Sequence, residues 1–166
     1  MLSLQSSPTT LGGLSVPAAN LQEGKLTAMT VEGFNQSLSA LAGTSVIVSA
    51  AYSDQNSEDA FVQSNFSNES WLQAEYWRVI GGGEMRISNF DHRQKYGLTT
   101  PIDAIQELQV RLRDQRVIDV QIDEKTGDLI FQFTGEVKFQ AFSFTGYEDW
   151  QIKFPNATGE YSNYAG

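Results

Sequence analysis

Residues 146–164 read GYEDWQIKFPNATGEYSNY, and residues 75–90 read EYWRVIGGGEMRISNF. Both stretches contain Glu-x-Trp, an aliphatic residue two positions after the Trp, a Gly-rich or Asn-rich turn, then Gly-Glu and Ser-Asn followed by an aromatic residue. Alternating strands on either side of such a turn are typical of a β-hairpin. The sequence therefore predicts the same strand–turn–strand unit twice.

A helix and further strands precede each hairpin. Apolar residues recur at spacings of three and four in Val31–Leu41 and in Ile102–Leu112, which predicts one amphipathic helix before each set of strands. Thr30 and the pair Thr100-Pro101 favour the two helix starts. Strands are expected at 46–52, at 60–66 as a short edge strand, at 71–80 as one long strand, and at 84–90, 118–122, 128–134, 137–144, 150–154 and 161–164.

Two details of register follow from the alternation. Val46, Val48 and Ala50 match Ile118, Val120 and Ile122 when the halves are offset by 72 residues, whereas the Val-Ile identity at Val46 and Val117 needs an offset of 71. Because a one-residue slip moves every side chain to the other face, we follow the first match and expect Ile118 in the core. The alternation also breaks after Phe139, which predicts a β-bulge near Ala141.

These patterns predict a mostly β, α+β fold: two internally duplicated helix-plus-antiparallel-meander units, with the two main helices packed on the sheets. Residues 29–166 are expected to form a single domain with halves at 29–91 and 99–164, preceded by an N-terminal arm at 1–28. The alternative is convergence of two meanders on similar amphipathic patterns.

Composition and charge exclude several classes of protein. With 11 basic and 20 acidic side chains the formal net charge is −9, a balance that disfavours nucleic acid and anionic membranes as partners and favours a basic one, unless it serves solubility alone. The chain has no cysteine, which excludes disulfides and a catalytic thiol. It shows no secretory signal and no apolar run of membrane-spanning length, so we expect a cytoplasmic protein that is a monomer or a homodimer.

The sequence shows no catalytic set, and no metal or cofactor is expected. The single His, His92, lies in a polar loop, and there is no Gly-x-Ser-x-Gly motif or phosphate-binding loop. Four acidic residues crowd one predicted hairpin without the spacing of a calcium-binding loop, and a solvated turn explains them better: Asp119, Asp123, Glu124 and Asp128.

The candidate binding residues come from the repeated stretches. Trp77 and Trp150 are expected in the core, or else beside a groove between the two halves. Glu75 and Glu148 precede them at matching positions and share their face by parity, so they would sit at the rim of that groove. Close to the C-terminal end, Tyr161 and Tyr164 lie among Asn and Ser in a segment suited to protein contacts.

GYEDW followed by Gln-Ile, from Gly146 onward, resembles a class of small uncharacterised bacterial α+β domains with a late Tyr-Glu-x-Trp strand, some of which are similar to immunity proteins encoded beside bacterial toxins. The resemblance covers about twenty residues, and the doubling departs from it. It implies structural roles for Tyr147, Glu148 and Trp150, and a non-enzymatic protein-binding domain such as an acidic inhibitor of a basic toxin.

Two other hypotheses stay open. One is a small-ligand-binding or enzymatic domain that uses the groove between the halves. The other is a structural subunit that exchanges its N-terminal arm between copies.

Overall fold

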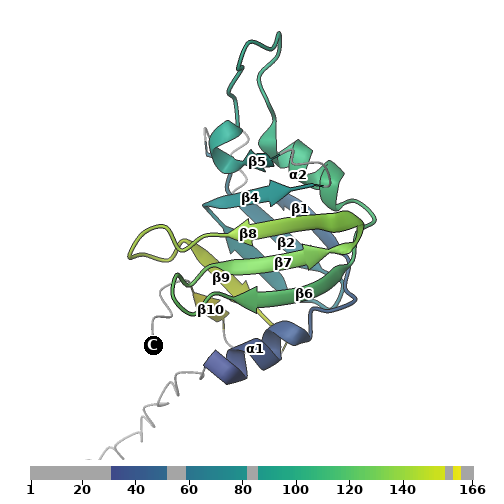
Figure 1. Cartoon of the computed structure of the whole chain (residues 1–166), viewed down its shortest axis with the longest axis vertical. Coiled ribbons are helices and arrows are strands. Elements are labelled where there is room, and N and C mark those ends of the chain that lie inside the picture. The colour runs from purple at the N-terminus through teal and green to yellow at the C-terminus, as the bar shows by residue number, and fades with distance from the viewer. Residues whose placement is uncertain (1–30, 52–58, 82–85, 156–158, 162–166) are drawn as a thin grey trace, which may run out of the picture.

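The described part of the chain contains two α-helices and ten strands, in the order α-helix, five strands, α-helix, five strands, with two short 3-10 helices, η1 (Asn89–Asp91) and η2 (Thr134–Glu136). The computed structural model describes residues 31–51, 59–81, 86–155 and 159–161. The strands form two antiparallel five-stranded sheets, which together with the helices make a mixed α+β fold (Figure 1). The expected N-terminal arm lies outside the described residues, as do Thr30 and Tyr164.

The first sheet has the order β1-β2-β3-β9-β10. Its strands are β1 (Val46–Ala50), β2 (Val62–Phe66), β3 (Trp71–Ala74), β9 (Trp150–Lys153) and β10 (Gly159–Tyr161). The second sheet has the order β5-β4-β8-β7-β6. Its strands are β5 (Arg86–Ser88), β4 (Trp77–Ile80), β8 (Val137–Ala141), β7 (Leu129–Phe133) and β6 (Val117–Ile122).

The two sheets have the same connectivity when β6–β10 are matched in order with β1–β5. In each sheet, the first three strands of one half of the chain pair with the last two strands of the other half. Each sheet is therefore built from both halves of the sequence.

The core fills the space between the sheets. Alternate residues of the strands point into it, as their period of two requires, and aromatic rings meet across it: Phe66 of β2 stacks on Phe131 of β7 with centroids 5.8 Å apart. Trp77 and Trp150 are the two largest fully buried side chains.

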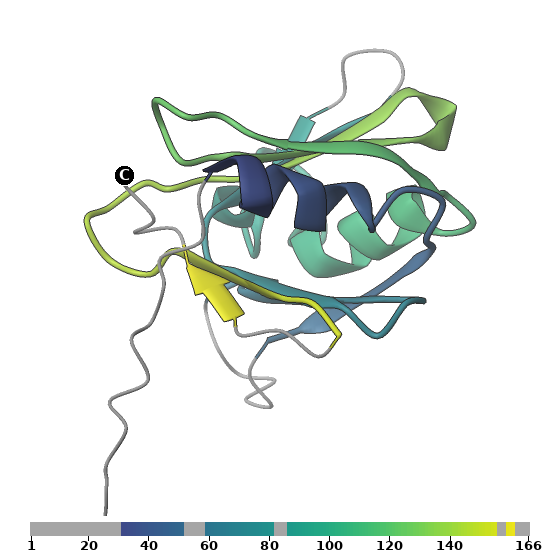
Figure 2. The same ribbon diagram turned by 90° about the horizontal axis from the view of Figure 1, so that it is seen from below.

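Each helix closes one open side of the sandwich (Figure 2). Helix α2 (Ala104–Leu112) packs against β1 and β5, and the Gln109 amide donates to the carbonyl of Val48 at 2.9 Å, which satisfies an acceptor on the free edge of β1. Helix α1 (Val31–Ser39) packs against β6, and its Phe34 stacks on Trp150 with centroids 6.1 Å apart.

The chain passes between the sheets at two places, which we call the crossovers. Glu75 and Tyr76 form the first, between β3 and β4, and residues 142–149 form the second, between β8 and β9. The crossovers lie side by side, because the Glu75 N–H donates to the Asp149 carbonyl at 2.9 Å and the Phe142 N–H donates to the Tyr76 carbonyl at 2.8 Å. At the opposite end of the sandwich a bridge between Ser45 and Arg116 joins the residues directly before β1 and β6, and the Val117 N–H donates to the Thr44 carbonyl beside it at 2.9 Å.

Four expectations about the strands are wrong. The long strand 71–80 is two strands in different sheets, and the strand near 60–66 lies inside its sheet, not at an edge. There is no bulge near Ala141, because β8 ends there and the second crossover begins. The register shift instead lies between Val117 and Asp119, so Val117 is buried while Ile118 is 59% exposed.

The second helix also begins later than expected. Its N-cap is Asp103, whose carboxylate accepts the Gln106 N–H at 3.0 Å, and the Thr100-Pro101 pair lies in the loop before it. A carboxylate at the N-cap accepts a hydrogen bond from a free amide of the first turn, and its negative charge interacts favourably with the helix dipole. The neutral hydroxyl of Thr100 would lack this charge interaction.

Candidate functional site

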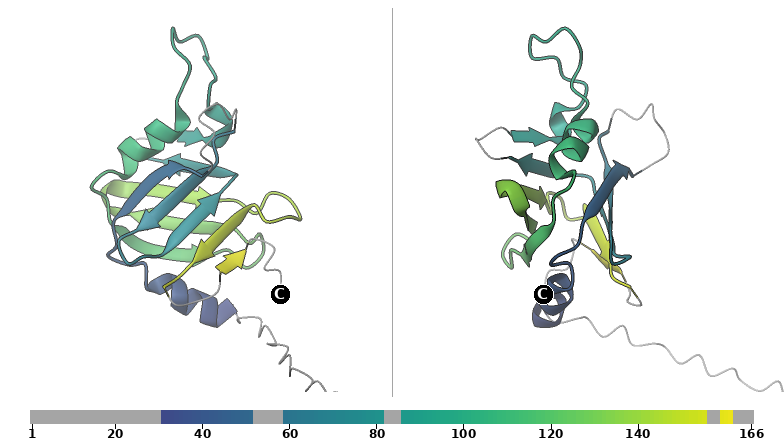
Figure 3. Two further views of the ribbon diagram at one scale, coloured as in Figure 1. Left: turned by 180° about the vertical axis from the view of Figure 1, so that it is seen from behind. Right: turned by 90° about the vertical axis from the view of Figure 1, so that its right-hand side faces the viewer.

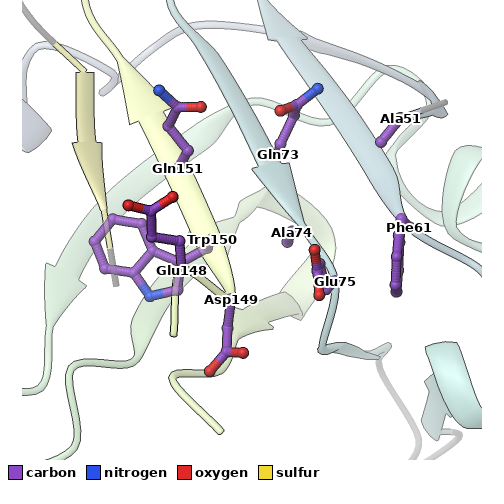
Figure 4. A pocket seen from close by; sticks show the side chains of 9 residues that line it. All are labelled: Ala51, Phe61, Gln73, Ala74, Glu75, Glu148, Asp149, Trp150 and Gln151. Carbon is purple, nitrogen blue, oxygen red and sulfur yellow. The ribbon is translucent and has the colours of Figure 1, made fainter. Parts of the chain in front are cut away.

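The crossovers bring Glu75 and Glu148 to one pocket. The pocket has a volume of about 170 Å³ and opens on the outer face of the first sheet, beside Gln73 and Gln151 (Figure 4). A second pocket of about 480 Å³ shares Glu75, Glu148 and Asp149 with the first and continues toward Tyr76, Thr145 and Tyr147. We call these six residues the crossover site: Glu75, Tyr76, Thr145, Tyr147, Glu148 and Asp149.

Asp149 holds the second crossover in shape. Its side chain is buried, and its carboxylate accepts the Thr145 N–H at 2.5 Å and the Thr145 hydroxyl at 2.7 Å. The Thr145 hydroxyl oxygen in turn accepts the Tyr147 N–H at 3.1 Å. These bonds fold residues 145–149 into a compact turn, so Tyr147 and Glu148 project from a fixed backbone.

Glu75 lies in an environment that disfavours its charge. Partial burial raises the pKa of the Glu75 carboxyl above its usual range, and the negative charges of Asp149 and then Asp59 raise it further. Neither Glu75 nor Glu148 is in an ion pair with another described residue. Arg78, on strand β4, is not an ionic partner of either glutamate. Its guanidinium donates to Gln140 at 2.7 Å and lies over the ring of Phe142.

Tyr76 of the crossover site packs with two further aromatic rings, those of Phe90 and Phe144, and we call these three rings the aromatic cluster. Tyr76 lies 5.1 Å from Phe144 and 6.0 Å from Phe90 between ring centroids, and Phe90 meets Phe144 edge to face at 6.5 Å. Phe144 is 69% exposed and the nearby Tyr147 is 82% exposed. Adjacent exposed aromatic side chains are uncommon on a monomer and are typical of a contact surface.

The structure buries both predicted tryptophans, although Trp150 lines the same pocket as Glu75 and Glu148. The indoles of Trp77 and Trp150 are in the core, where Trp77 donates to the Ala60 carbonyl at 2.6 Å and Trp150 to the Gly127 carbonyl at 3.0 Å. Their rings therefore present almost no surface to a ligand. Glu75 and Glu148 line one pocket, and the groove between the halves stays a prediction.

The C-terminal tyrosines are placed only in part. The backbone of Tyr161 pairs with Gln151 at the edge of the first sheet, and Tyr164 lies outside the described residues.

The acidic hairpin and His92 have structural contacts. The Asp123 carboxylate accepts the N–H groups of Lys125 and Thr126 in the β6–β7 turn, and Asp128 accepts the Ser143 N–H. His92 accepts the Ala104 N–H at 3.2 Å at the start of α2. Among the residues that the structure describes, no group of His, Asp and Glu side chains is arranged to hold a metal ion.

Sequence reasoning missed the aromatic cluster. Phe142 and Phe144 break the alternation of β8, and that break was the available signal, although it marks the end of the strand and not a bulge. Nothing in the sequence indicates that Phe90 meets Phe144, because the two residues belong to segments far apart in the chain.

Within the described ranges, no helix is both long enough and apolar enough to cross a membrane. No protein-family model, no curated protein and no solved structure matches this chain. What the crossover site can bind therefore follows from its own residues.

Proposed function

We propose that this chain is a non-enzymatic protein-binding domain, and that its binding surface is the crossover site together with the aromatic cluster. One observation carries the proposal: two glutamates without a cationic partner among the described residues lie beside exposed aromatic rings. Aromatic side chains supply much of the energy of protein interfaces, and unpaired carboxylates select the charge of the partner.

The proposed partner presents basic side chains. A lysine or arginine entering the pocket would pair with Glu148 and Glu75 and lie near the rings of Tyr76 and Tyr147, where cation–π attraction adds about 0.5–2 kcal/mol. The net charge of −9 would accelerate association with such a protein. For a partner that is a different protein, we favour one specific function: this chain would be an acidic inhibitor of a basic bacterial toxin domain. The GYEDW resemblance implies this function.

Affinity capture from native lysate tests the proposal with three forms of the tagged chain. The site variant is Glu148→Lys/Phe144→Ala. The control variant, Glu69→Lys/Ile47→Ala, makes the same chemical changes at exposed positions away from the crossovers. We expect wild type and control to retain one basic protein at near one-to-one stoichiometry and the site variant to lose it. Equal retention by all three forms would reject the site.

A small-ligand-binding or enzymatic domain is the second candidate, and the convergence of Glu75 and Glu148 on one pocket favours it. A carboxyl of raised pKa in a concave site is a candidate acid or base. Cationic probes such as arginine amide or spermidine can be titrated while the side-chain carboxyl carbons are followed by NMR. Saturable shifts confined to these two glutamates, and lost in Glu75→Gln/Glu148→Gln, would support this candidate; their absence would reject it.

We further propose that the halves 29–91 and 99–164 arose by internal duplication. The matching sheet connectivity supports this, as do the equivalent indole bonds of Trp77 and Trp150. The two crossover bonds are equivalent as well. Glu75 and Phe142 each come directly after the third strand of a half, and each N–H donates to the carbonyl of the residue directly before the Trp strand of the other half. A relative with one half that assembles as a strand-exchanged homodimer would support this origin. Relatives in which only one half keeps the helix-and-five-strand order would contradict it.

A further inference from the structure

A narrow loop projects from the body of the molecule beside the crossover site. Residues 92–103, which we call the finger, connect the short turn after β5 to α2 and extend away from both sheets (Figures 1 and 3). The two sides of the finger are bonded together, because the Arg93 N–H donates to the Ile102 carbonyl at 2.7 Å and the Ile102 N–H donates to the Gln94 carbonyl at 2.9 Å. The Leu98 N–H closes the tip by donating to the Lys95 carbonyl at 2.6 Å.

The finger presents apolar and basic groups to solvent. Tyr96 is 69% exposed and Leu98 is 57% exposed at its tip. Arg93 and Lys95 are exposed on the same loop, and neither is in an ion pair with another described residue. A bonded loop with an aromatic and an aliphatic side chain at its tip loses little conformational entropy on docking.

The finger is joined to the crossover site through the aromatic cluster. Phe90 packs against Tyr76 and Phe144, and the chain enters the finger two residues later. The hydroxyl of Tyr96 donates to the Asp91 carboxylate at 3.0 Å, which anchors the finger to this junction. The acidic crossover site and the finger that carries Arg93 and Lys95 therefore adjoin the same aromatic cluster.

We infer that the crossover site, the aromatic cluster and the finger bind a second copy of the chain, with the finger of each copy docked in the crossover site of the other. The inference rests on the proposed function and names its partner. A surface that is acidic at one end, aromatic in the middle and basic at the other is complementary to itself when turned by 180° about its middle. A twofold axis at the aromatic cluster brings Arg93 and Lys95 to Glu148 and Glu75 twice, and buries Phe90, Phe144 and Tyr147 between the copies.

Local charge complementarity fits this occupant, although each copy carries a net charge of −9. The site needs a basic group and an apolar one on a rigid support, and the finger supplies both. The finger in turn needs carboxylates beside an apolar surface, which the crossover site supplies.

Sedimentation velocity over a range of concentrations tests the inference on the full chain. The finger variant is Arg93→Glu/Lys95→Glu, the site variant is Glu148→Lys, and the control is Glu69→Lys, which makes the same change as the site variant at the far end of the sandwich. We expect wild type and control to approach the dimer mass. Each charge-reversed variant alone should show a dissociation constant raised by at least about tenfold, because like charges then face each other.

An equimolar mixture of the two charge-reversed variants gives the decisive result. In that mixture both contacts again join opposite charges, so heterodimers should form at concentrations at which each variant alone is largely monomeric. Circular dichroism checks that each variant is folded. A wild type that stays monomeric at every concentration, or variants that dimerise as wild type does, would overturn the inference. If the monomeric chain still retains a basic lysate protein through Glu148 and Phe144, the proposed function stands without the dimer.

Discussion

The surroundings of Glu75 disfavour its charge. A raised pKa in the folded state means that folding favours the protonated carboxyl, so this group contributes most to stability below its unfolded pKa. The contribution is lost as the pH rises through the folded pKa. At neutral pH, Glu75 is therefore a destabilising charge.

Replacing Glu75 by Gln should raise the Tm at pH 7, because the charge penalty disappears. The difference from wild type should shrink as the pH falls through the raised folded pKa of Glu75, and it should vanish below the unfolded pKa, where the wild-type carboxyl is protonated in both states. Thermal unfolding between pH 3 and pH 8 measures this dependence. Glu69→Gln, which removes an exposed carboxylate in the β2–β3 turn, is the control. A Glu75→Gln chain less stable than wild type at pH 7 would show that the carboxylate has a stabilising partner.

Asp149, in contrast to Glu75, should stabilise the folded protein, because its buried carboxylate accepts two hydrogen bonds from Thr145. Asp149→Ala leaves the Thr145 N–H and hydroxyl without their acceptor, and hydrogen bonds to a charged group contribute about 1.5–3 kcal/mol. Because Thr145 is exposed, water replaces part of this contribution, and the loss should lie at the low end of that range. Urea unfolding measures the loss. Thr145→Ala and the double variant complete a cycle, in which the two effects should be clearly less than additive. Additive costs would mean that the two side chains do not support each other.

At the scale of elements, the apolar periodicity predicted the order of helices and strands, because each element has one face in the core. It did not predict where the chain changes sheet. Leu72 and Ala74 are buried before the first crossover and Trp77 and Val79 after it, so the buried parity switches from even to odd. The two sheets face the core from opposite sides, and the switch records the passage between them. Residues 71–80 are apolar enough throughout to suggest one long strand, so the switch of parity inside this run is easily overlooked.

The crossover site was predictable only in its glutamates. Their place before the repeated tryptophans put them at matching positions, and matching crossovers brought them together. The sequence could not show that Tyr76, Phe90 and Phe144 would meet, since that contact depends on the pairing of β4 with both β5 and β8. Contacts between distant segments set the chemistry of the surface, and alternation along one strand carries no information about them.

The repeated Trp strands, β4 and β9, should contribute to stability in parallel but unequal ways. Trp77→Phe leaves the buried Ala60 carbonyl unpaired and should cost about 2–4 kcal/mol, including the lost volume. Trp150→Phe should cost less, because the Gly127 carbonyl lies in a turn that water can reach. Urea unfolding followed by circular dichroism gives both values, with the half-buried Trp71→Phe as control. A larger loss at Trp150 than at Trp77 would contradict this ranking.

At the scale of the whole molecule, the exchange of strands makes the two halves depend on each other. Strands β1, β2 and β3 need β9 to complete their sheet, and β8 needs β4. Each helix also packs against the first strand of the other half, α1 on β6 and α2 on β1. Neither half holds a complete hydrophobic core, so the described sandwich should unfold in a single cooperative transition.

Cutting the chain at the tip of the finger tests this dependence. A break between Tyr96 and Gly97 falls in an exposed turn and separates the halves without interrupting a strand or helix. We expect neither fragment to fold as a monomer, because each would expose the inner faces of two incomplete sheets. Mixing them should restore a one-to-one complex with the circular dichroism spectrum of the intact chain, since every strand pair between the halves can form again. Size-exclusion chromatography with light scattering measures the stoichiometry, and the intact chain refolded in parallel is the control. A fragment that folds alone as a stable monomer would show that its half has a core of its own, and that the exchange of strands does not hold the fold together.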